Sequence, residues 1–182
     1  MTLRYDLAPT PVGTAIAVLS PLGLLALRVT ADDDRWVLEM LAREHGVVPD
    51  HAPGAGSDLF AQLDEYFGGA RRSFDIELDW GLTRGFAAQA LRAVCDIPYG
   101  ETASYGEVAA MAGRPGAARA VGSACRATPF SLVVPVHRVI RSDGSLGEYG
   151  SAPEAKRFLV DLERRSSRSA ASSPARERSR RT

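Results

Sequence analysis

Residues 104–127 read SYGEVAAMAGRPGAARAVGSACRA, and their pattern indicates the architecture of the second half of the chain. Serine is a favoured residue at the start of a helix, so Ser104 is predicted to open one that runs through Met111. Glycine and proline in residues 113–116 predict a turn, and the small residues from 117 to 127 predict a second helix. Two short helices joined in this way are typical of a helix-turn-helix, a DNA-binding motif.

Motifs on both sides of this stretch extend the pattern. Residues 97–102 read IPYGET and residues 135–140 read PVHRVI, while SYGEV and AARAVG lie between them. Four motifs in this order resemble the O6-alkylguanine-DNA alkyltransferases, and the similarity runs from about Phe86 to Glu163. The resemblance implies an α/β N-terminal domain similar to ribonuclease H. It also implies a mostly α, winged-helix-like second domain, whose helix-turn-helix enters the minor groove of DNA.

The resemblance further implies a chemistry, together with one alteration of it. In the family the motif is Pro-Cys-His-Arg-Val, and its cysteine accepts the alkyl group from the damaged base. Val136 stands at the cysteine position here, and valine has no lone pair with which to attack a carbon. His137 matches the family's base, which acts on the thiol through a water. Glu163 matches the residue that orients this base. We therefore expect a remnant site of Val136, His137 and Glu163 with no active catalytic residue.

A DNA-binding surface and a pocket for a flipped base are also implied by the resemblance. Arg119 matches the arginine that takes the place of the flipped base, and Tyr105 matches the tyrosine that helps to turn the nucleotide out. The expected DNA contacts are Tyr105, Ala118, Arg119, Arg126 and Thr128, and the expected pocket residues are Cys125, Pro135, Val136, Val139, Tyr149, Gly150 and Ser151.

The first 80 residues are predicted to form an acidic α/β domain. Apolar runs at residues 14–19 and 24–29 flank a turn-rich stretch, which suits an antiparallel hairpin. Apolar residues at helical spacing predict helices over residues 34–44 and 57–67. The alkyltransferase-like domain is expected over residues 81–163. Residues 164–182, which are rich in serine and arginine, are expected to be disordered.

The composition limits the possible sites and partners. The 182 residues include 22 basic and 22 acidic side chains, but residues 1–80 carry 6 basic and 13 acidic ones. DNA is therefore expected to contact the second half of the chain. With two cysteines and three histidines, no metal is expected, and no cofactor. No apolar run is long enough to span a membrane, so we expect a cytoplasmic protein, and a monomer.

Three functions follow as hypotheses. The first is a DNA-repair protein that binds O6-alkylguanine in duplex DNA, flips the base without dealkylating it, and passes the lesion to nucleotide-excision repair proteins. Such a protein is not an enzyme. The alternative is a methylated-DNA–protein-cysteine methyltransferase, with its acceptor cysteine substituted or with transfer to Cys125. A further alternative, a helix-turn-helix transcription regulator, predicts sequence-specific binding of undamaged DNA.

Overall fold

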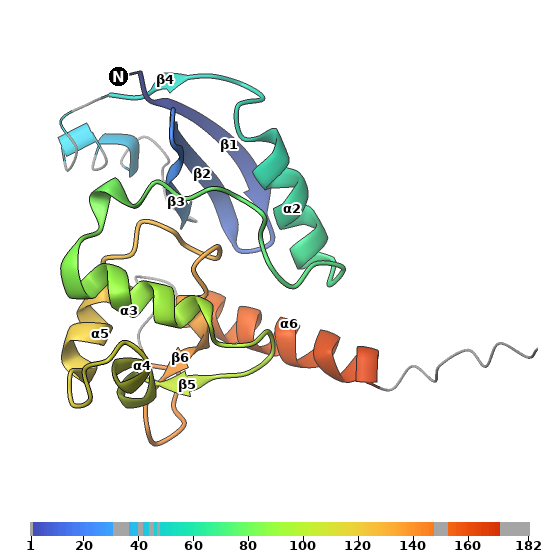
Figure 1. Cartoon of the computed structure of the whole chain (residues 1–182). Helices are drawn as coiled ribbons and strands as arrows, with labels where there is room; N and C mark the ends of the chain where they lie inside the picture. The colour runs from blue at the N-terminus through green and yellow to red at the C-terminus, as the bar shows by residue number, and fades with distance from the viewer. Residues whose placement is uncertain are drawn as a thin grey trace, which may run out of the picture.

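The computed structural model describes residues 2–30, 37–39, 42–43, 46, 48–147 and 153–171, with side chains of the last helix from 154 to 168. It is a mixed α/β structure, which confirms the coarse fold class predicted from the sequence. In Figure 1 the sheet and helix α2 form the upper part, and helices α3 to α6 form the lower part. Among the described helices, none combines the length and the apolar character needed to cross a bilayer.

The sheet is a meander with one added strand. Its order is β3-β2-β1-β4, formed by β1 (Arg4–Thr10), β2 (Gly13–Ser20), β3 (Gly23–Thr30) and β4 (Asp50–His51). β2 and β3 pair antiparallel, which confirms the predicted hairpin, and β4 joins the edge parallel to β1. Asp6 fixes this edge, because its carboxylate accepts hydrogen bonds from the backbone of Gly54 and Gly56 at 2.9 and 3.1 Å.

Helix α2 (Ser57–Phe67) has the bounds that apolar spacing predicts. Leu59, Leu63 and Tyr66 stand at intervals of four and three, so they share one face and are buried together. Gly68 and Gly69 end the helix, and Gly69 adopts a left-handed φ of 77°. Most of the other helix predicted in this half, over residues 34–44, lies outside the described residues. Its described residues, 37–39 and 42–43, are helical.

The second half contains short elements around three close-packed helices. A 3₁₀ turn, η1 (Trp80–Leu82), precedes α3 (Gly85–Cys95), and α4 (Tyr105–Met111) and α5 (Ala118–Arg126) follow. Ser104 caps α4: its hydroxyl accepts from the Glu107 backbone, while the Glu107 carboxylate accepts from the Ser104 backbone. Strands β5 (Ala103–Ser104) and β6 (Val139–Ile140) pair parallel, and η2 (Val136–Arg138) leads into β6. The predicted bounds of the two short helices are thus confirmed to within a residue.

Helix α6 (Pro153–Ala171) continues eight residues into the segment whose composition predicts disorder. Residues 164–171 therefore differ from the prediction, while residues 172–182 lie outside the described residues. The physical reason is tertiary contact: the Ser167 hydroxyl donates to the Tyr99 carbonyl at 3.5 Å, so the helix packs on the rest of the chain beyond Glu163. A polar composition gives no signal of such contacts.

One apolar cluster connects the sheet to α2 and to the helices of the second half. Leu27 of β3 donates to the Pro129 carbonyl at 2.7 Å and accepts from the Ser131 backbone at 3.0 Å, which ties the sheet to the loop after α5. Each fully buried leucine contributes about 1.5–3 kcal/mol to stability. Members of this cluster include Leu24 and Leu27 of β3, Leu59 and Leu63 of α2, and Val121 and Ala124 of α5.

Candidate active site

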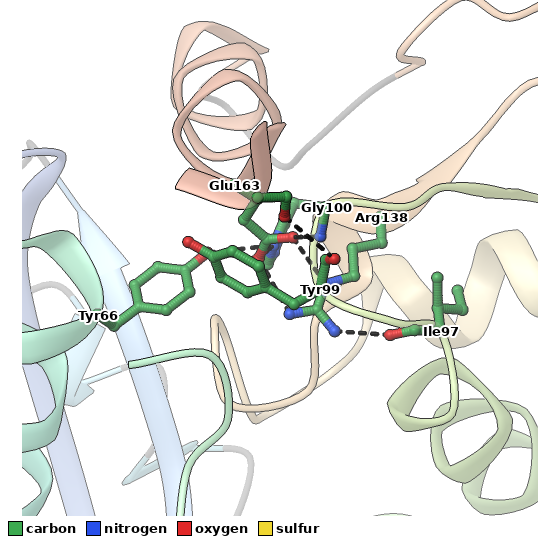
Figure 2. Close-up of polar contacts among 8 residues, drawn as sticks. Tyr66, Ile97, Tyr99, Gly100, Arg138 and Glu163 are labelled. Atoms are coloured by element: carbon green, nitrogen blue, oxygen red, sulfur yellow. Dashed lines mark hydrogen bonds and ion pairs between the residues drawn. The ribbon is translucent and has the colours of Figure 1, made fainter. Parts of the chain in front are cut away.

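The most strongly connected polar group of the interior is the Glu163 carboxylate. Its Oε1 accepts from Tyr66 Oη at 2.7 Å, from His137 Nε2 at 2.8 Å and from Arg138 Nη2 at 3.0 Å. Its Oε2 accepts from Arg138 Nε and from the Gly100 backbone, both at 3.0 Å. Figure 2 shows Tyr66 and Arg138 reaching Glu163 from different elements. Five donors on one buried carboxylate form a connected network in which both carboxylate oxygens are paired.

Four separate segments of the chain supply this network. Tyr66 comes from α2, Gly100 from the loop after α3, His137 and Arg138 from η2, and Glu163 from α6. Gly100 has a φ of 82°, and a Cβ added there would lie 2.3 Å from Ser167 Oγ. A glycine at this position therefore lets the loop approach α6 closely enough for its N–H to reach the carboxylate.

Burial and charge together set the protonation states of the network. Burial alone would raise the pKa of Glu163, but the hydrogen bonds and charges of His137 and Arg138 lower it to about 2. Burial lowers the pKa of His137, and the opposing pull of Glu163 does not overcome this. The pKa of Tyr66 is raised by burial and by the adjacent Glu163 charge. Near neutral pH the site therefore holds a carboxylate, a neutral imidazole and a neutral phenol.

The neutral imidazole has a defined tautomer. Because Nε2 of His137 lies 2.8 Å from the ionised carboxylate, Nε2 carries the proton and Nδ1 carries the lone pair. Nδ1 is buried and has no hydrogen-bond partner among the described residues. A buried nitrogen with a free lone pair is the arrangement of a proton acceptor. His137 and Glu163, which the sequence predicts to act as base and orienter, are thus brought together.

Val136 lies beside this histidine and is buried, with 5% of its surface exposed. It begins η2 after Pro135, and both are part of a tight loop in which Leu132 adopts a left-handed φ of 67°. A leucine in this region costs on the order of 1–3 kcal/mol, so the surrounding packing must hold the loop in place. The Val136 side chain is apolar, and valine has no lone pair that could serve as a nucleophile.

Cys125 lies on the last turn of α5 and is half-buried. Burial raises the pKa of its thiol to about 11, and the charge of Lys156 opposes this shift. Lys156 is itself buried, which lowers its pKa to about 8, and its Nζ donates to the Val139 carbonyl. Lys156 thus acts electrostatically on the thiol and is hydrogen-bonded to the first residue of β6. Cys95, on α3, is exposed, and its thiol donates a hydrogen bond to the Leu91 carbonyl at 3.4 Å.

The other predicted site residues lie at the surface, in the interior or outside the described residues. Tyr105 and Ala118 line an open pocket of about 380 Å³ that also contains Arg141, while Arg119 and Arg126 are exposed on α5. Thr128 is only 4% exposed and its hydroxyl accepts from the Phe130 backbone, while its predicted DNA contact stays a prediction. Pro135 and Val139 are buried near Val136. Tyr149, Gly150 and Ser151 lie outside the described residues.

Sequence reasoning did not find Tyr66, Gly100 or Arg138 as parts of the site. Gly100 and Arg138 lie inside two quoted motifs, so their place there was an available signal. Tyr66 gives no such signal, because it stands on the apolar face of α2 at ordinary core spacing. Within the described residues no three His, Cys, Asp or Glu side chains are grouped closely enough to hold a metal ion.

The chain is similar to proteins named methylated-DNA–protein-cysteine methyltransferases. The family described as "6-O-methylguanine DNA methyltransferase, DNA binding domain" matches residues 85–165. The protein of Mycobacterium tuberculosis is 48% identical over 62% of this chain and 67% of its own length. That of Mycolicibacterium paratuberculosis is 43% identical over 81% of this chain and 90% of its own.

Solved structures give the same relationship. The crystal structure of the O6-methylguanine methyltransferase of Mycobacterium tuberculosis has a TM-score of 0.76 at 36% identity and covers 96% of both chains. A structure of Mycobacterium tuberculosis OGT in complex with DNA has a TM-score of 0.76 at 37% identity, covering 91% of this chain and 94% of that one. The similarity therefore includes the sheet and α2 as well as the segment that carries the motifs.

Proposed function

Because the chain belongs to the methylated-DNA–protein-cysteine methyltransferase family, we propose that it removes the alkyl group from O6-alkylguanine in duplex DNA and transfers it to a cysteine of its own. The observation that carries this proposal is the buried network of His137, Glu163, Arg138 and Tyr66 beside position 136. A proton acceptor held in one tautomer beside position 136 is the arrangement that a thiol at that position would need in order to lose its proton.

This function corrects two expectations drawn from Val136. The missing acceptor predicts a protein that binds the lesion without dealkylating it, and hence a protein that is not an enzyme. Relatives at 43% and 48% identity are instead named as methyltransferases, and the solved O6-methylguanine methyltransferase matches nearly the whole chain. The expectation relied on one substituted position, whereas the similarity to methyltransferases extends over most of the chain.

Because position 136 is a valine, the alkyl group must be accepted by a cysteine elsewhere in the chain. We propose Cys125 as this acceptor. The Cys125 sulfur, as thiolate, forms a bond to the alkyl carbon while the bond between that carbon and O6 breaks. The electron pair of the broken bond goes to the guanine, which takes up the proton that the thiol released. The positive charge of buried Lys156 favours the thiolate, although the pKa of about 11 keeps this form scarce at neutral pH. Slow transfer is therefore expected.

Transfer to Cys125 has a direct test. After incubation with an O6-methylguanine duplex, peptide mass spectrometry is expected to find one added methyl group on the peptide containing Cys125. Cys125→Ser should remove this signal, whereas Cys95→Ser, which changes the exposed thiol of α3, should retain it. A methyl group on the Cys95 peptide, or an unmodified protein after prolonged incubation, would contradict the assignment.

We propose α4 and α5 as a helix-turn-helix that contacts the minor groove and flips the damaged base. The support is the exposed Arg119 on a helix of small residues, with Tyr105 in the open pocket beside it. Base flipping leaves a gap in the duplex that an inserted side chain can fill. The flipped base would then lie near Cys125 and the buried loop at Val136. The two halves are proposed to be ribonuclease H-like and winged-helix-like.

Arg119→Ala is expected to reduce the preference for a lesion-containing duplex over its unmodified twin by about tenfold, which is a typical loss for one inserted contact. Arg157→Ala removes another exposed arginine, from α6, and serves as the matched control, with an unchanged preference expected. Competition binding at fixed salt measures both. Equal affinity for the two duplexes combined with a strong sequence preference would favour a transcription regulator instead.

A further inference from the structure

Tyr66 is the one member of the buried network that comes from the first half of the chain. It lies on α2, outside the matched residues 85–165, and only 1% of its surface is exposed. Its hydroxyl donates to Glu163 Oε1 at 2.7 Å and lies 3.4 Å from His137 Nε2. A tyrosine on a core face needs a partner for its hydroxyl, and here that partner is the residue that orients the histidine.

The ring of Tyr66 is held on several sides. Phe67, Phe74 and Tyr99 have ring centroids 5.5, 5.3 and 6.1 Å away, and the contacts with Phe67 and Tyr99 are edge-on. Aromatic contacts of this kind restrict the orientation of the ring independently of the hydrogen bond. The hydroxyl therefore reaches the carboxylate from a fixed point, with no entropy cost of ordering a long side chain.

Tyr66 and His137 donate to the same oxygen of Glu163. Each donor withdraws part of the negative charge from that oxygen, so the hydroxyl weakens the pull of Glu163 on a proton bound to the imidazole. The other charges that act on His137 are Arg138 of η2 and Lys156 of α6. Both are positive, so Glu163 is the only named charge that favours the protonated imidazole.

We propose that Tyr66 is a positioning residue of the alkyl-transfer site, which fixes the Glu163 carboxylate and thereby the tautomer and base strength of His137 beside position 136. The inference rests on the proposed function, because it assigns the histidine a proton-accepting role. It gives the first half of the chain a part in the chemistry, although that half carries no motif of its own.

Nitrogen-15 NMR of His137 in the free protein tests this without DNA. In the unchanged protein Nε2 is expected to be protonated and Nδ1 unprotonated at neutral pH. Tyr66→Phe retains the ring but removes the donor, so the midpoint of His137 titration should move to higher pH. Tyr99→Phe is the matched control, because the Tyr99 hydroxyl is buried without a partner among the described residues, and no comparable movement is expected. An equal midpoint in both variants, or a proton on Nδ1 in the unchanged protein, overturns the proposal.

A rate measurement adds a chemical readout. In the Val136→Cys background, which places a thiol beside His137, Tyr66→Phe is expected to slow methyl transfer by about 10- to 100-fold, as for other misplaced catalytic groups. Tyr99→Phe should leave the rate in this background unchanged, and an equal rate for both variants counts against Tyr66. If no methyl transfer occurs in any protein, the proposed function fails, while the NMR comparison still decides whether Tyr66 controls His137.

Discussion

Glu163→Gln is expected to lower the free energy of unfolding by about 3–5 kcal/mol, the usual cost of removing one partner from a buried ion pair. The side chains of Glu163 and Arg138 are 1% and 9% exposed, so the guanidinium would lose its anion in a place that water hardly reaches. Glutamine retains the volume but offers one acceptor oxygen where the carboxylate offers two. Urea denaturation of the two proteins at pH 7 measures the difference.

Glu65→Gln is the matched control for this prediction. Glu65 also pairs with an arginine, Arg71, at 2.7 Å, but its side chain is 52% exposed. Exposed pairs contribute about 0–1 kcal/mol, so this variant should unfold almost as the unchanged protein does. Equal losses in the two variants would contradict the view that the Glu163 network is a buried, rigid unit.

The pH dependence of stability gives a second measurement on the same residue. The pKa of Glu163 is lowered from 4.5 to about 2, so its stabilising effect is complete above 4.5 and is lost as the pH falls toward 2. The pKa of His137 is lowered from 6.5, so below about pH 6.5 the unfolded chain binds a proton that the folded protein does not, and stability falls. The unchanged protein should thus weaken steadily on acidification from about pH 6.5. Glu163→Gln should show a flatter profile below pH 4.5.

Val136→Cys is expected to speed methyl transfer by about 10²- to 10⁴-fold, the usual contribution of a positioned base. Cysteine at this position would stand next to His137, whose unprotonated Nδ1 has no partner among the described residues. The adjacent base supplies what Cys125 lacks, since burial holds the pKa of the Cys125 thiol near 11. Single-turnover transfer from a labelled duplex gives the rates, and peptide mapping should place the methyl group on residue 136.

Val133→Cys controls for the mere addition of a thiol to this loop. Val133 is half-buried three residues earlier, away from the histidine in sequence, and no gain in rate is expected. If Val136→Cys binds the lesion duplex but transfers no faster than the unchanged protein, then His137 is not the base, and the mechanism proposed for the site is wrong.

The elements that the sequence predicts well are those whose signals are local. α2 follows from apolar spacing and a glycine pair, and the β2–β3 hairpin follows from two apolar runs around a turn. β1 carries no comparable signal, because only one of its seven residues is buried, so the strand depends on its pairing with β2. The extension of α6 depends in the same way on contacts with distant residues.

The residues of the site differ in the same way, because some carry a local sequence signal and others do not. His137 and Glu163 lie within or at a fixed interval from a recognisable motif, so their partnership can be predicted. Tyr66 is 71 residues from His137 and 97 from Glu163 in sequence, and nothing near it marks it as polar machinery. The expected function changed for a different reason. Val136 is a single substituted side chain, whereas the similarity to methyltransferases extends over most of the chain.

The apolar cluster that joins β3 to α5 has a mechanical consequence. Leu24 and Leu27 of the sheet pack in the same interior as Val121 and Ala124, on the helix that bears Arg119. Close-packed interiors resist small displacements, so α5 cannot tilt without disturbing the sheet behind it. We therefore expect a stiff protein surface and a compliant duplex: the distortion needed to extract a base falls on the DNA, and lesions that weaken base pairing are the easiest to extract.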